Sequence, residues 1–277
     1  MKAALLQITS GDDPAANLAM VTALVRQAAA QGAGFVLTPE VTNVVTANRA
    51  HRDAVVQDQA DDITLAGLRA EAAALGIWLS VGSLLIRTKD ADGRVANRSF
   101  LIDQAGAIVA QYDKIHLFDV QVSPTETYRE SAGVRPGNQA VVANTPFGRV
   151  GLTVCYDLRF PQLHRTLAHA GAEIILQPAA FSTVTGAAHW EPLLRARAIE
   201  TGCYVLAAAQ TGLHPSSTGE MRRTYGHSMA ISPWGEVLLD AGTAPGISYV
   251  DLDRAEVAQA RMRIPALDHD RPFANPV

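Results

Sequence analysis

Short apolar runs of strand length alternate along this chain with longer runs of helical periodicity. Residues 3–8 are predicted to form a buried strand, residues 17–30 carry apolar side chains spaced as on one face of a helix, and residues 35–38 form a second strand that Pro39 ends. The later runs predict strands at residues 77–86, 150–154, 173–177 and 204–209, and helices at residues 63–75 and 190–201. A further helix is expected to follow the strand 150–154 and to end at about residue 170. Two hairpins are predicted, at residues 95–112 and 229–240. This order predicts an α/β fold with a mixed sheet covered by helices.

No low-complexity linker, charge block or repeat divides the 277 residues, so we expect a single domain, residues 1–277. Apolar residues make up 48% of the chain and the net charge is −4, which favours a filled core and gives no basic surface for nucleic acid. No apolar stretch reaches the roughly 18 residues of a membrane span, and residues 1–10 lack the features of a signal peptide. We therefore expect a cytoplasmic protein with no nucleic-acid or membrane partner.

The chain contains two cysteines, Cys155 and Cys203, and their contexts differ. Cys203 begins an apolar run without polar neighbours, which predicts a packing role. Cys155 lies where the alternating strand 150–154 ends and polar residues begin, and Pro161 suits the first turn of a following helix. Ligands bind at such corners, where free backbone N–H groups are expected to lower the pKa of the thiol and to hold an oxyanion. Cys155 is therefore a candidate nucleophile, with a small core residue as the alternative.

Two further polar residues directly follow predicted strands. Glu40 follows the strand 35–38 and Pro39, where an unpaired carboxylate is costly, and Lys114 follows the strand 108–112. A thiol nucleophile needs a base and a group that stabilises the developing oxyanion, and these two residue types supply both. A lone glutamate or lysine at such a place is more often a solvated surface charge, so the prediction depends on the three residues occurring together. We see no histidine and cysteine spacing typical of a metal site, so no metal is expected.

The segments that contain these three residues resemble the nitrilase superfamily of carbon–nitrogen hydrolases. The segments are Leu37-Thr38-Pro39-Glu40, residues 112–117 and residues 154–161, and the resemblance extends from residues 4–7 to residues 271–272. Residues 185–191, 194–200 and 225–229 are similar to the branch of amidases that act on deaminated glutathione and on related ω-amides such as α-ketoglutaramate. The resemblance implies an αββα sandwich that forms a homodimer or a larger homo-oligomer and uses no cofactor.

The resemblance also implies the roles of the catalytic residues. Cys155 is expected to be the nucleophile, Glu40 the general base and Lys114 the group that stabilises the tetrahedral intermediate. Glu130 matches a second glutamate that supports the site, with a loop surface charge as its alternative. The implied reaction is hydrolysis of a small primary amide through a thioester at Cys155, with release of ammonia.

The same resemblance implies that Tyr156, Arg159, Phe181 and Thr185 bind the substrate. The backbone N–H of Tyr156 is expected to share the oxyanion with the lysine. A guanidinium binds carboxylates bidentately, so Arg159 is expected to hold a substrate carboxylate, and an ion pair with Asp157 or another nearby acid is the alternative.

The sequence leaves other functions open. A nitrilase or an N-carbamoyl amide hydrolase would use the same three catalytic residues, and a non-catalytic binding or scaffold protein would keep the fold. Thr38 stands where the family more often has an apolar residue, and residues 41–60, expected to form one wall of the pocket, contain few aromatic residues. The chemistry is therefore better defined by the sequence than the substrate.

Overall fold

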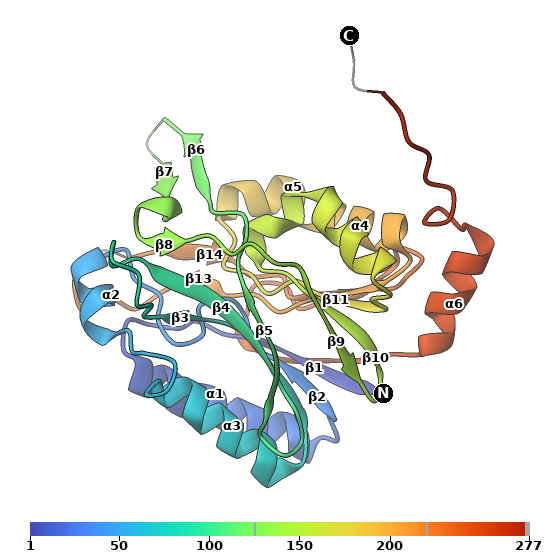
Figure 1. The fold of residues 1–277 in the computed structure, drawn as a ribbon. Helices are drawn as coiled ribbons and strands as arrows, with labels where there is room; N and C mark the ends of the chain where they lie inside the picture. The colour runs from blue at the N-terminus through green and yellow to red at the C-terminus, as the bar shows by residue number, and fades with distance from the viewer. Residues whose placement is uncertain (125, 220, 275–277) are drawn as a thin grey trace.

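The computed structural model describes residues 1–124, 126–219 and 221–274, and two β-sheets lie face to face at its centre (Figure 1). The first sheet has the order β17 (Gly246–Asp251), β1 (Lys2–Gln7), β2 (Phe35–Leu37), β3 (Trp78–Ile86), β4 (Val95–Ile102) and β5 (Ile108–Asp113), and β8 (Val134–Arg135) pairs with β4. The second sheet has the order β16 (Val237–Asp240), β15 (Met229–Ile231), β12 (Tyr204–Ala207), β11 (Ile174–Leu176), β10 (Gly148–Leu152) and β9 (Val141–Thr145). Two small sheets pair β6 (Asp119–Ser123) with β7 (Glu126–Arg129) and β13 (Thr211–Leu213) with β14 (Arg223–Tyr225).

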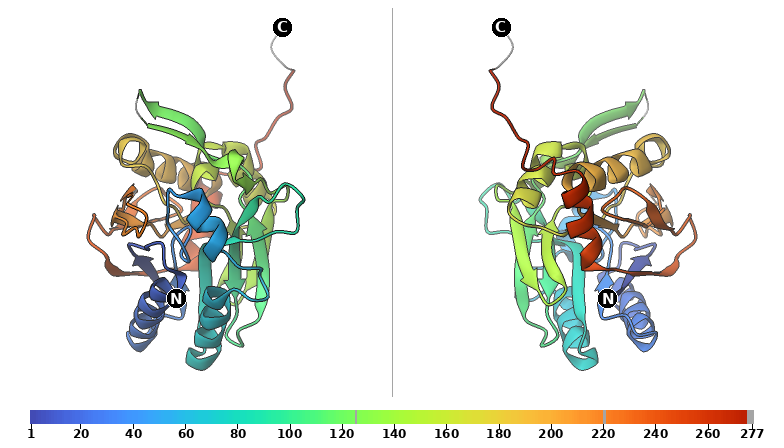
Figure 2. Two further views of the ribbon diagram at one scale, coloured as in Figure 1. Left: turned by 90° about the vertical axis from the view of Figure 1, so that its left-hand side faces the viewer. Right: turned by 90° about the vertical axis from the view of Figure 1, so that its right-hand side faces the viewer.

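Helices cover the outer face of each large sheet. Figures 1 and 2 show α1 (Pro14–Ala30) and α3 (Ile63–Leu75) on the side of the first sheet, and α4 (Pro161–His169) and α5 (Thr183–Thr201) on the side of the second. The other helices are α2 (Arg49–Val55), α6 (Arg254–Arg263) and the 3₁₀ helices η1 (Glu130–Ala132) and η2 (Cys155–Arg159). This layering confirms the predicted αββα sandwich. No helix among the described residues combines the length and the apolar character needed to cross a bilayer.

Alternation of side chains along the strands explains the layers. In β1, Ala3 and Leu5 belong to the core between the sheets, which also contains Leu152 of the second sheet. Ala4 and Leu6 point the other way and pack with side chains of α1 and α3. A strand directs successive side chains to opposite faces, so an uninterrupted apolar run is what a sheet buried on both faces requires.

The site is positioned by the parallel part of each sheet. β1, β2 and β3 are parallel in the first sheet, and β10, β11 and β12 are parallel in the second. The carboxyl ends of parallel strands meet at the same edge of a sheet. The segments that follow β10 and β11, which contain Cys155 and Ala180, therefore begin at neighbouring positions of the second sheet. The N–H of Ala180 donates to Glu40 at 2.8 Å, which brings the segment after β2 of the first sheet to the same place.

Two helices begin earlier than predicted. We predicted the first helix from residue 17, but α1 begins at Pro14, because the Asp13 carboxylate accepts hydrogen bonds from the N–H groups of Ala15 (2.9 Å) and Ala16 (3.3 Å). The helix predicted from residue 190 begins at Thr183. Its first turns contain β-branched residues and a glycine, which have weak helical propensity, so tertiary packing decides this start.

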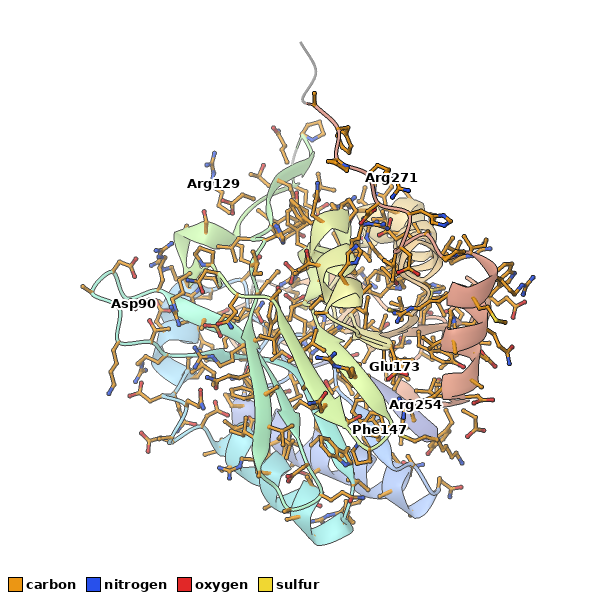
Figure 3. The ribbon with its side chains drawn as sticks, turned by 45° about the vertical axis from the view of Figure 1, so that its right-hand side comes forward. Asp90, Arg129, Phe147, Glu173, Arg254 and Arg271 are labelled. Atoms are coloured by element: carbon orange, nitrogen blue, oxygen red, sulfur yellow. The ribbon has the colours of Figure 1, made fainter. Side chains whose placement is uncertain are left out.

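The C-terminal elements were not predicted. β17 pairs antiparallel with β1 over its whole length, from Gly246 opposite Gln7 to Asp251 opposite Lys2. Figure 3 shows Arg254 of α6 beside Glu173, with which it forms an ion pair of 3.0 Å. Phe147, labelled in the same view at the β9–β10 turn, packs on Phe35 of the first sheet with ring centroids 4.8 Å apart. These contacts join the end of the chain and the second sheet to the first.

Candidate active site

The turn after β2 is held in a strained conformation that directs Glu40 into the interior. Val41 has φ of 50°, which is rare for a β-branched residue, and its N–H donates to Ser83 Oγ at 2.9 Å. The Thr38 hydroxyl accepts a hydrogen bond from the N–H of Gly82 at 3.1 Å. The threonine that departs from the family pattern thus helps to fix the turn, and Glu40 is only 4% exposed.

Each carboxylate oxygen of Glu40 has a hydrogen-bond donor. Oε1 accepts from Lys114 Nζ at 3.0 Å and from Asn97 Nδ2 at 2.9 Å, and Oε2 accepts from the N–H of Ala180 at 2.8 Å. These donors come from the first sheet and from the segment after β11. Glu40 therefore joins the two sheets at the strand edge.

Lys114 lies between two carboxylates. Its ammonium is 3.0 Å from Glu40 Oε1 and 2.9 Å from Glu130 Oε2, and the lysine is 2% exposed. Glu130, at the start of η1, also accepts the N–H of Phe118 at 2.7 Å. Glu130 is thus a partner of Lys114 and not the loop surface charge considered as its alternative.

Cys155 stands at a strained corner between β10 and α4. Its φ is 49°, its N–H donates to the carbonyl of Pro178 at 2.8 Å, and its own carbonyl accepts from Gln177 Nε2 at 3.0 Å. The N–H of Tyr156 in the next position has no acceptor among the described residues. The corner therefore holds the thiol and leaves one backbone donor available beside it.

Asp157 connects this corner to the segment that carries Lys114. Its fully buried carboxylate accepts from the Val154 N–H (2.9 Å) and from the Tyr112 hydroxyl (2.6 Å), and it bonds both the backbone N–H (3.0 Å) and Nδ1 (2.7 Å) of His116. Tyr112 and His116 flank Lys114 in the chain. The carboxylate of Asp157 thus holds the segment of the nucleophile and the segment of the lysine together.

Burial and charge set the protonation states of the cluster. Burial raises the pKa of the Cys155 thiol well above 9.0, and the charge of Glu40 adds to this more than Lys114 opposes it. Burial alone would raise the pKa of Glu40, but Lys114 and the hydrogen bond from Cys155 bring it below 4.5. Burial also acts to lower the pKa of Lys114, yet Glu130 and Glu40 hold it well above 10.5. At neutral pH Cys155 is therefore a thiol, Glu40 a carboxylate and Lys114 an ammonium.

The expectation that backbone N–H groups would lower the pKa of Cys155 was therefore wrong. Desolvation disfavours the thiolate, and the neighbouring carboxylate of Glu40 disfavours it further. A carboxylate beside a protonated thiol is the arrangement that a general base requires before attack.

Arg159 ends η2, the 3₁₀ helix that begins with Cys155, and has no carboxylate partner among the described residues. Its guanidinium carbon is 5.9 Å from the centre of the Tyr156 ring and 5.7 Å from that of Phe181, and Nη2 donates to His189 Nδ1 at 3.2 Å. The alternative of an ion pair with Asp157 was wrong, because that carboxylate is committed to other donors. Arg159 is therefore a cation available to a bound anion.

Thr185 lies on the first turn of α5 and not on a loop. Its hydroxyl oxygen is buried and has no hydrogen-bond partner among the described residues, and the same holds for Ser182 at the helix N-cap. Buried hydroxyl groups normally find a partner. Phe181, immediately before them, is 4% exposed and packs on Trp190.

Two residues near the cluster were missed by the sequence analysis. Asn97 donates to Glu40 and is 3.4 Å from Glu130 Oε1, but Arg98 and Ser99 follow it in β4, so no local pattern distinguishes Asn97 from its polar neighbours. Arg222 donates to the carbonyl of Ala180 at 2.9 Å, and its charge lowers the pKa of Glu40. No local pattern distinguishes Arg222 from its neighbour Arg223.

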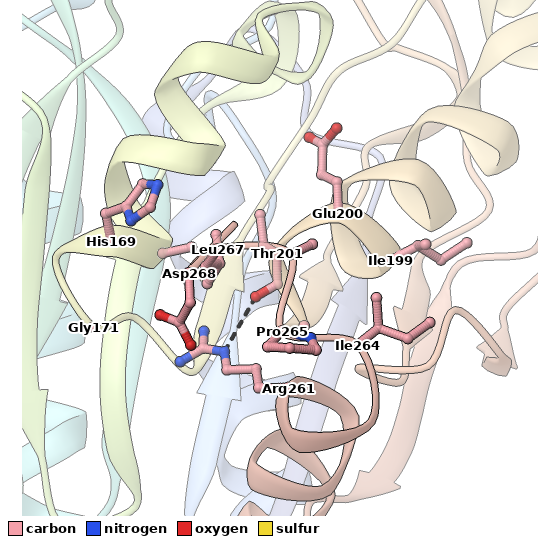
Figure 4. A pocket seen from close by; sticks show the side chains of 13 residues that line it. His169, Gly171, Ile199, Glu200, Thr201, Arg261, Ile264, Pro265, Leu267 and Asp268 are labelled. Carbon is pink, nitrogen blue, oxygen red and sulfur yellow. Dashed lines mark hydrogen bonds between the residues drawn. The ribbon is translucent and has the colours of Figure 1, made fainter. Parts of the chain in front are cut away.

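A separate cavity of about 260 Å³ lies between α4, α5 and the end of α6 (Figure 4). Arg261 lines it and donates to the carbonyl of Thr201 at 3.2 Å. None of the predicted site residues lines it. Cys203 is fully buried nearby, 3.1 Å from the carbonyl of Ala172, as its predicted packing role requires. Within the described ranges, no three His, Cys, Asp or Glu side chains are grouped as a metal site.

The comparisons with known proteins agree with this geometry. A profile of the carbon–nitrogen hydrolase family matches residues 2–262. The deaminated glutathione amidase of Yersinia enterocolitica is 42% identical over 269 residues, which are 97% of this chain and 92% of that protein. The structure of the C. elegans NitFhit protein matches with a TM-score of 0.89 at 34% identity, over 98% of this chain and 65% of that chain. Saccharomyces cerevisiae Nit3, a member of branch 10 of the nitrilase superfamily, matches with a TM-score of 0.84 at 28% identity, over 96% and 94% of the two chains. The chain is an amidase that belongs to the carbon–nitrogen hydrolase family of the nitrilase superfamily.

Proposed function

We propose that this amidase hydrolyses the ω-amide of an α-keto acid, deaminated glutathione or a relative such as α-ketoglutaramate, through a thioester at Cys155. One observation carries the proposal. A buried thiol, carboxylate and ammonium lie together at the strand edge, with Arg159 as an available cation beside them. A carboxylate on the acyl part of the substrate matches that cation, because guanidinium groups bind carboxylates with two parallel hydrogen bonds.

In the first half of the reaction, Glu40 takes the thiol proton as the sulfur of Cys155 forms a bond to the amide carbon. Lys114 and the N–H of Tyr156 stabilise the charge that develops on the carbonyl oxygen, and loss of one such donor costs about 2.7–4 kcal/mol in the barrier. Glu40 then gives its proton to the amide nitrogen. The C–N bond breaks, the amine leaves, and a thioester remains on the enzyme.

In the second half, Glu40 removes a proton from water as the water oxygen attacks the thioester carbon. The tetrahedral species collapses, the sulfur leaves and regains a proton, and the acid is released. Glu130 accepts two hydrogen bonds from Lys114 and so keeps its ammonium charged and directed. In this scheme Glu130 orients the lysine and does not touch the reacting atoms.

The leaving group distinguishes the two candidate substrates. α-Ketoglutaramate carries a primary amide and releases ammonia, as predicted from the sequence. The scissile amide of deaminated glutathione is secondary, so its leaving group is the amine of a dipeptide. The relative from Yersinia enterocolitica is named for the second substrate. For that substrate the prediction of ammonia release requires revision, while the thioester chemistry is the same.

The test is steady-state kinetics with four substrates: deaminated glutathione, α-ketoglutaramate, a simple nitrile and an N-carbamoyl amino acid. We expect turnover of the two keto-acid amides. Cys155→Ala should abolish turnover and retain the fold by circular dichroism, and Cys203→Ala, at the buried cysteine remote from the site, should retain activity. Turnover of the nitrile or the carbamoyl compound alone would refute the proposed substrate class, and an active Cys155→Ala variant would refute the mechanism.

The role of Arg159 is tested with the same assay. Replacement by Met should lower kcat/KM for both keto-acid amides about 10- to 100-fold, the usual loss when a charged hydrogen bond is removed. Replacement by Lys should recover part of this loss. Equal kcat/KM values for the wild type and Arg159→Met would refute the proposal that Arg159 binds a carboxylate of the substrate.

Three predictions from the sequence belong to the same proposal: residues 1–277 form a single domain, the chain assembles into a homodimer or a larger homo-oligomer, and the protein acts in the cytoplasm. Light scattering measures the assembly, and a monomer at micromolar concentration would contradict it. Cell fractionation with an activity assay measures the location.

A further inference from the structure

Arg222 is a second guanidinium group near the candidate active site, besides that of Arg159. Its side chain is partly buried, Nη2 donates to the carbonyl of Ala180 at 2.9 Å, and its guanidinium carbon lies 5.8 Å from the centre of the Tyr128 ring. The N–H of the same Ala180 donates to Glu40. One residue therefore links Arg222 directly to the proposed base.

The position of Arg222 is fixed while most of its donors remain available. The N–H of His214 donates to the carbonyl of Arg222 at 2.8 Å and holds its backbone. Among the described residues, no carboxylate lies within 4.0 Å of its guanidinium, whereas other partly buried arginines such as Arg98 are paired with carboxylates. A guanidinium has five N–H donors, and only the bond to Ala180 uses one here.

In the proposed mechanism the guanidinium groups of Arg159 and Arg222 lie near different parts of the substrate. Arg159 is four residues after the nucleophile and packs on Phe181 and Tyr156. Arg222 is joined through Ala180 to Glu40, the group that protonates the departing nitrogen in the proposed mechanism. A substrate that reaches Arg159 with its acyl part therefore directs its leaving group toward Glu40 and Arg222.

From this geometry we infer that Arg222 is a specificity residue that binds a carboxylate on the leaving group. The inference rests on the proposed function, and it identifies the preferred substrate as a dianion with one carboxylate on each side of the scissile amide. Deaminated glutathione has this arrangement, because its leaving dipeptide ends in the carboxylate of glycine. α-Ketoglutaramate has only the carboxylate on the acyl side.

The test compares deaminated glutathione with an analogue whose glycine carboxylate is a carboxamide. In the wild-type enzyme, kcat/KM for the carboxylate substrate should exceed that for the carboxamide about 10- to 100-fold. Arg222→Met should bring this ratio close to one, and Arg222→Lys should leave an intermediate ratio. Arg223→Met changes the adjacent, exposed arginine and should keep the wild-type ratio.

The ratio is the decisive quantity because both substrates are measured on the same enzyme sample. A change in the pKa of Glu40 or in the folded fraction affects both substrates and cancels in the ratio. A wild-type ratio near one, or an unchanged ratio in Arg222→Met, would overturn the inference. Turnover of α-ketoglutaramate without deaminated glutathione would overturn it and leave the proposed function intact, whereas turnover of neither would overturn both.

Discussion

Gly82 of β3 is the position where one added methyl group should disturb the site most. A Cβ atom there would lie 2.1 Å from the carbonyl oxygen of Thr38, 2.6 Å from the carbonyl carbon of Pro39 and 2.6 Å from Cβ of Pro178. The first two residues directly precede Glu40. Pro178 accepts the N–H of Cys155. Gly82→Ala therefore pushes on the base and on the support of the nucleophile at once.

The geometry gives the size of the effect. Cβ contacts in proteins stay above 3.0 Å, so the alanine or the Thr38 carbonyl must move by about 0.9 Å. The obstacles are backbone atoms and a proline ring, which cannot rotate away. Overpacking of this kind lowers the free energy of unfolding by about 1–3 kcal/mol. A displacement of about 1 Å at a catalytic group lowers the rate about 10²-fold.

The measurement is urea unfolding together with kcat for deaminated glutathione. Gly34→Ala is the matched control, because a Cβ at Gly34 meets no atom within 4 Å, and this variant should keep both quantities close to the wild-type values. Wild-type stability and wild-type kcat in Gly82→Ala would refute the argument that close backbone packing positions the base.

Four other predictions follow from the protonation states and the buried contacts. Glu40 is ionised, Cys155 is protonated and Lys114 is charged at neutral pH. The value of kcat/KM should therefore be constant between about pH 6 and 8 and should fall only in acid, where Glu40 gains a proton. A tenfold rise of kcat/KM between these two pH values would indicate that a free thiolate is required. The lowered pKa of Glu40 stabilises the fold above its unfolded value near 4.5, and this contribution should disappear as the pH falls through the folded pKa in acid-unfolding titrations. Lys114→Met leaves the buried carboxylate of Glu40 and the partly buried carboxylate of Glu130 without their ammonium partner and should lower the unfolding free energy by about 3–5 kcal/mol. Exposed Lys89→Met should change it by less than about 0.5 kcal/mol, and equal effects of the two variants would contradict the ion-pair cluster. Asp157→Asn cannot accept all four hydrogen bonds and should lower kcat and cost about 1–3 kcal/mol of stability, and unchanged values would show that Asp157 does not position the lysine segment.

Local sequence patterns were sufficient to predict the main strands and helices and the polar residues that follow three of the strands. Glu40, Lys114 and Cys155 each come within three residues of the end of a strand, β2, β5 and β10 respectively, and these strands were predicted from the sequence. Glu130 became a candidate only through the resemblance to a family, since an isolated glutamate between polar residues carries no signal of its own. The structure brings the four side chains together.

Other features depend on contacts between distant segments and could not be predicted locally. β17 forms its hydrogen bonds with β1, at the opposite end of the chain. Arg222 becomes part of the site only because the segment before β14 packs on Ala180. The predicted direction of the Cys155 pKa shift was wrong because it also depends on distant segments. Burial and the charge of Glu40 raise the pKa of the thiol, and they outweigh the backbone donors at the corner.

Mass spectrometry of the intact protein during turnover of a slow ω-amide, followed by peptide mapping, tests the thioester directly. The account predicts one acyl adduct, located on Cys155 and absent from Cys155→Ala. An adduct on another residue, or catalytic turnover by Cys155→Ala, would contradict it.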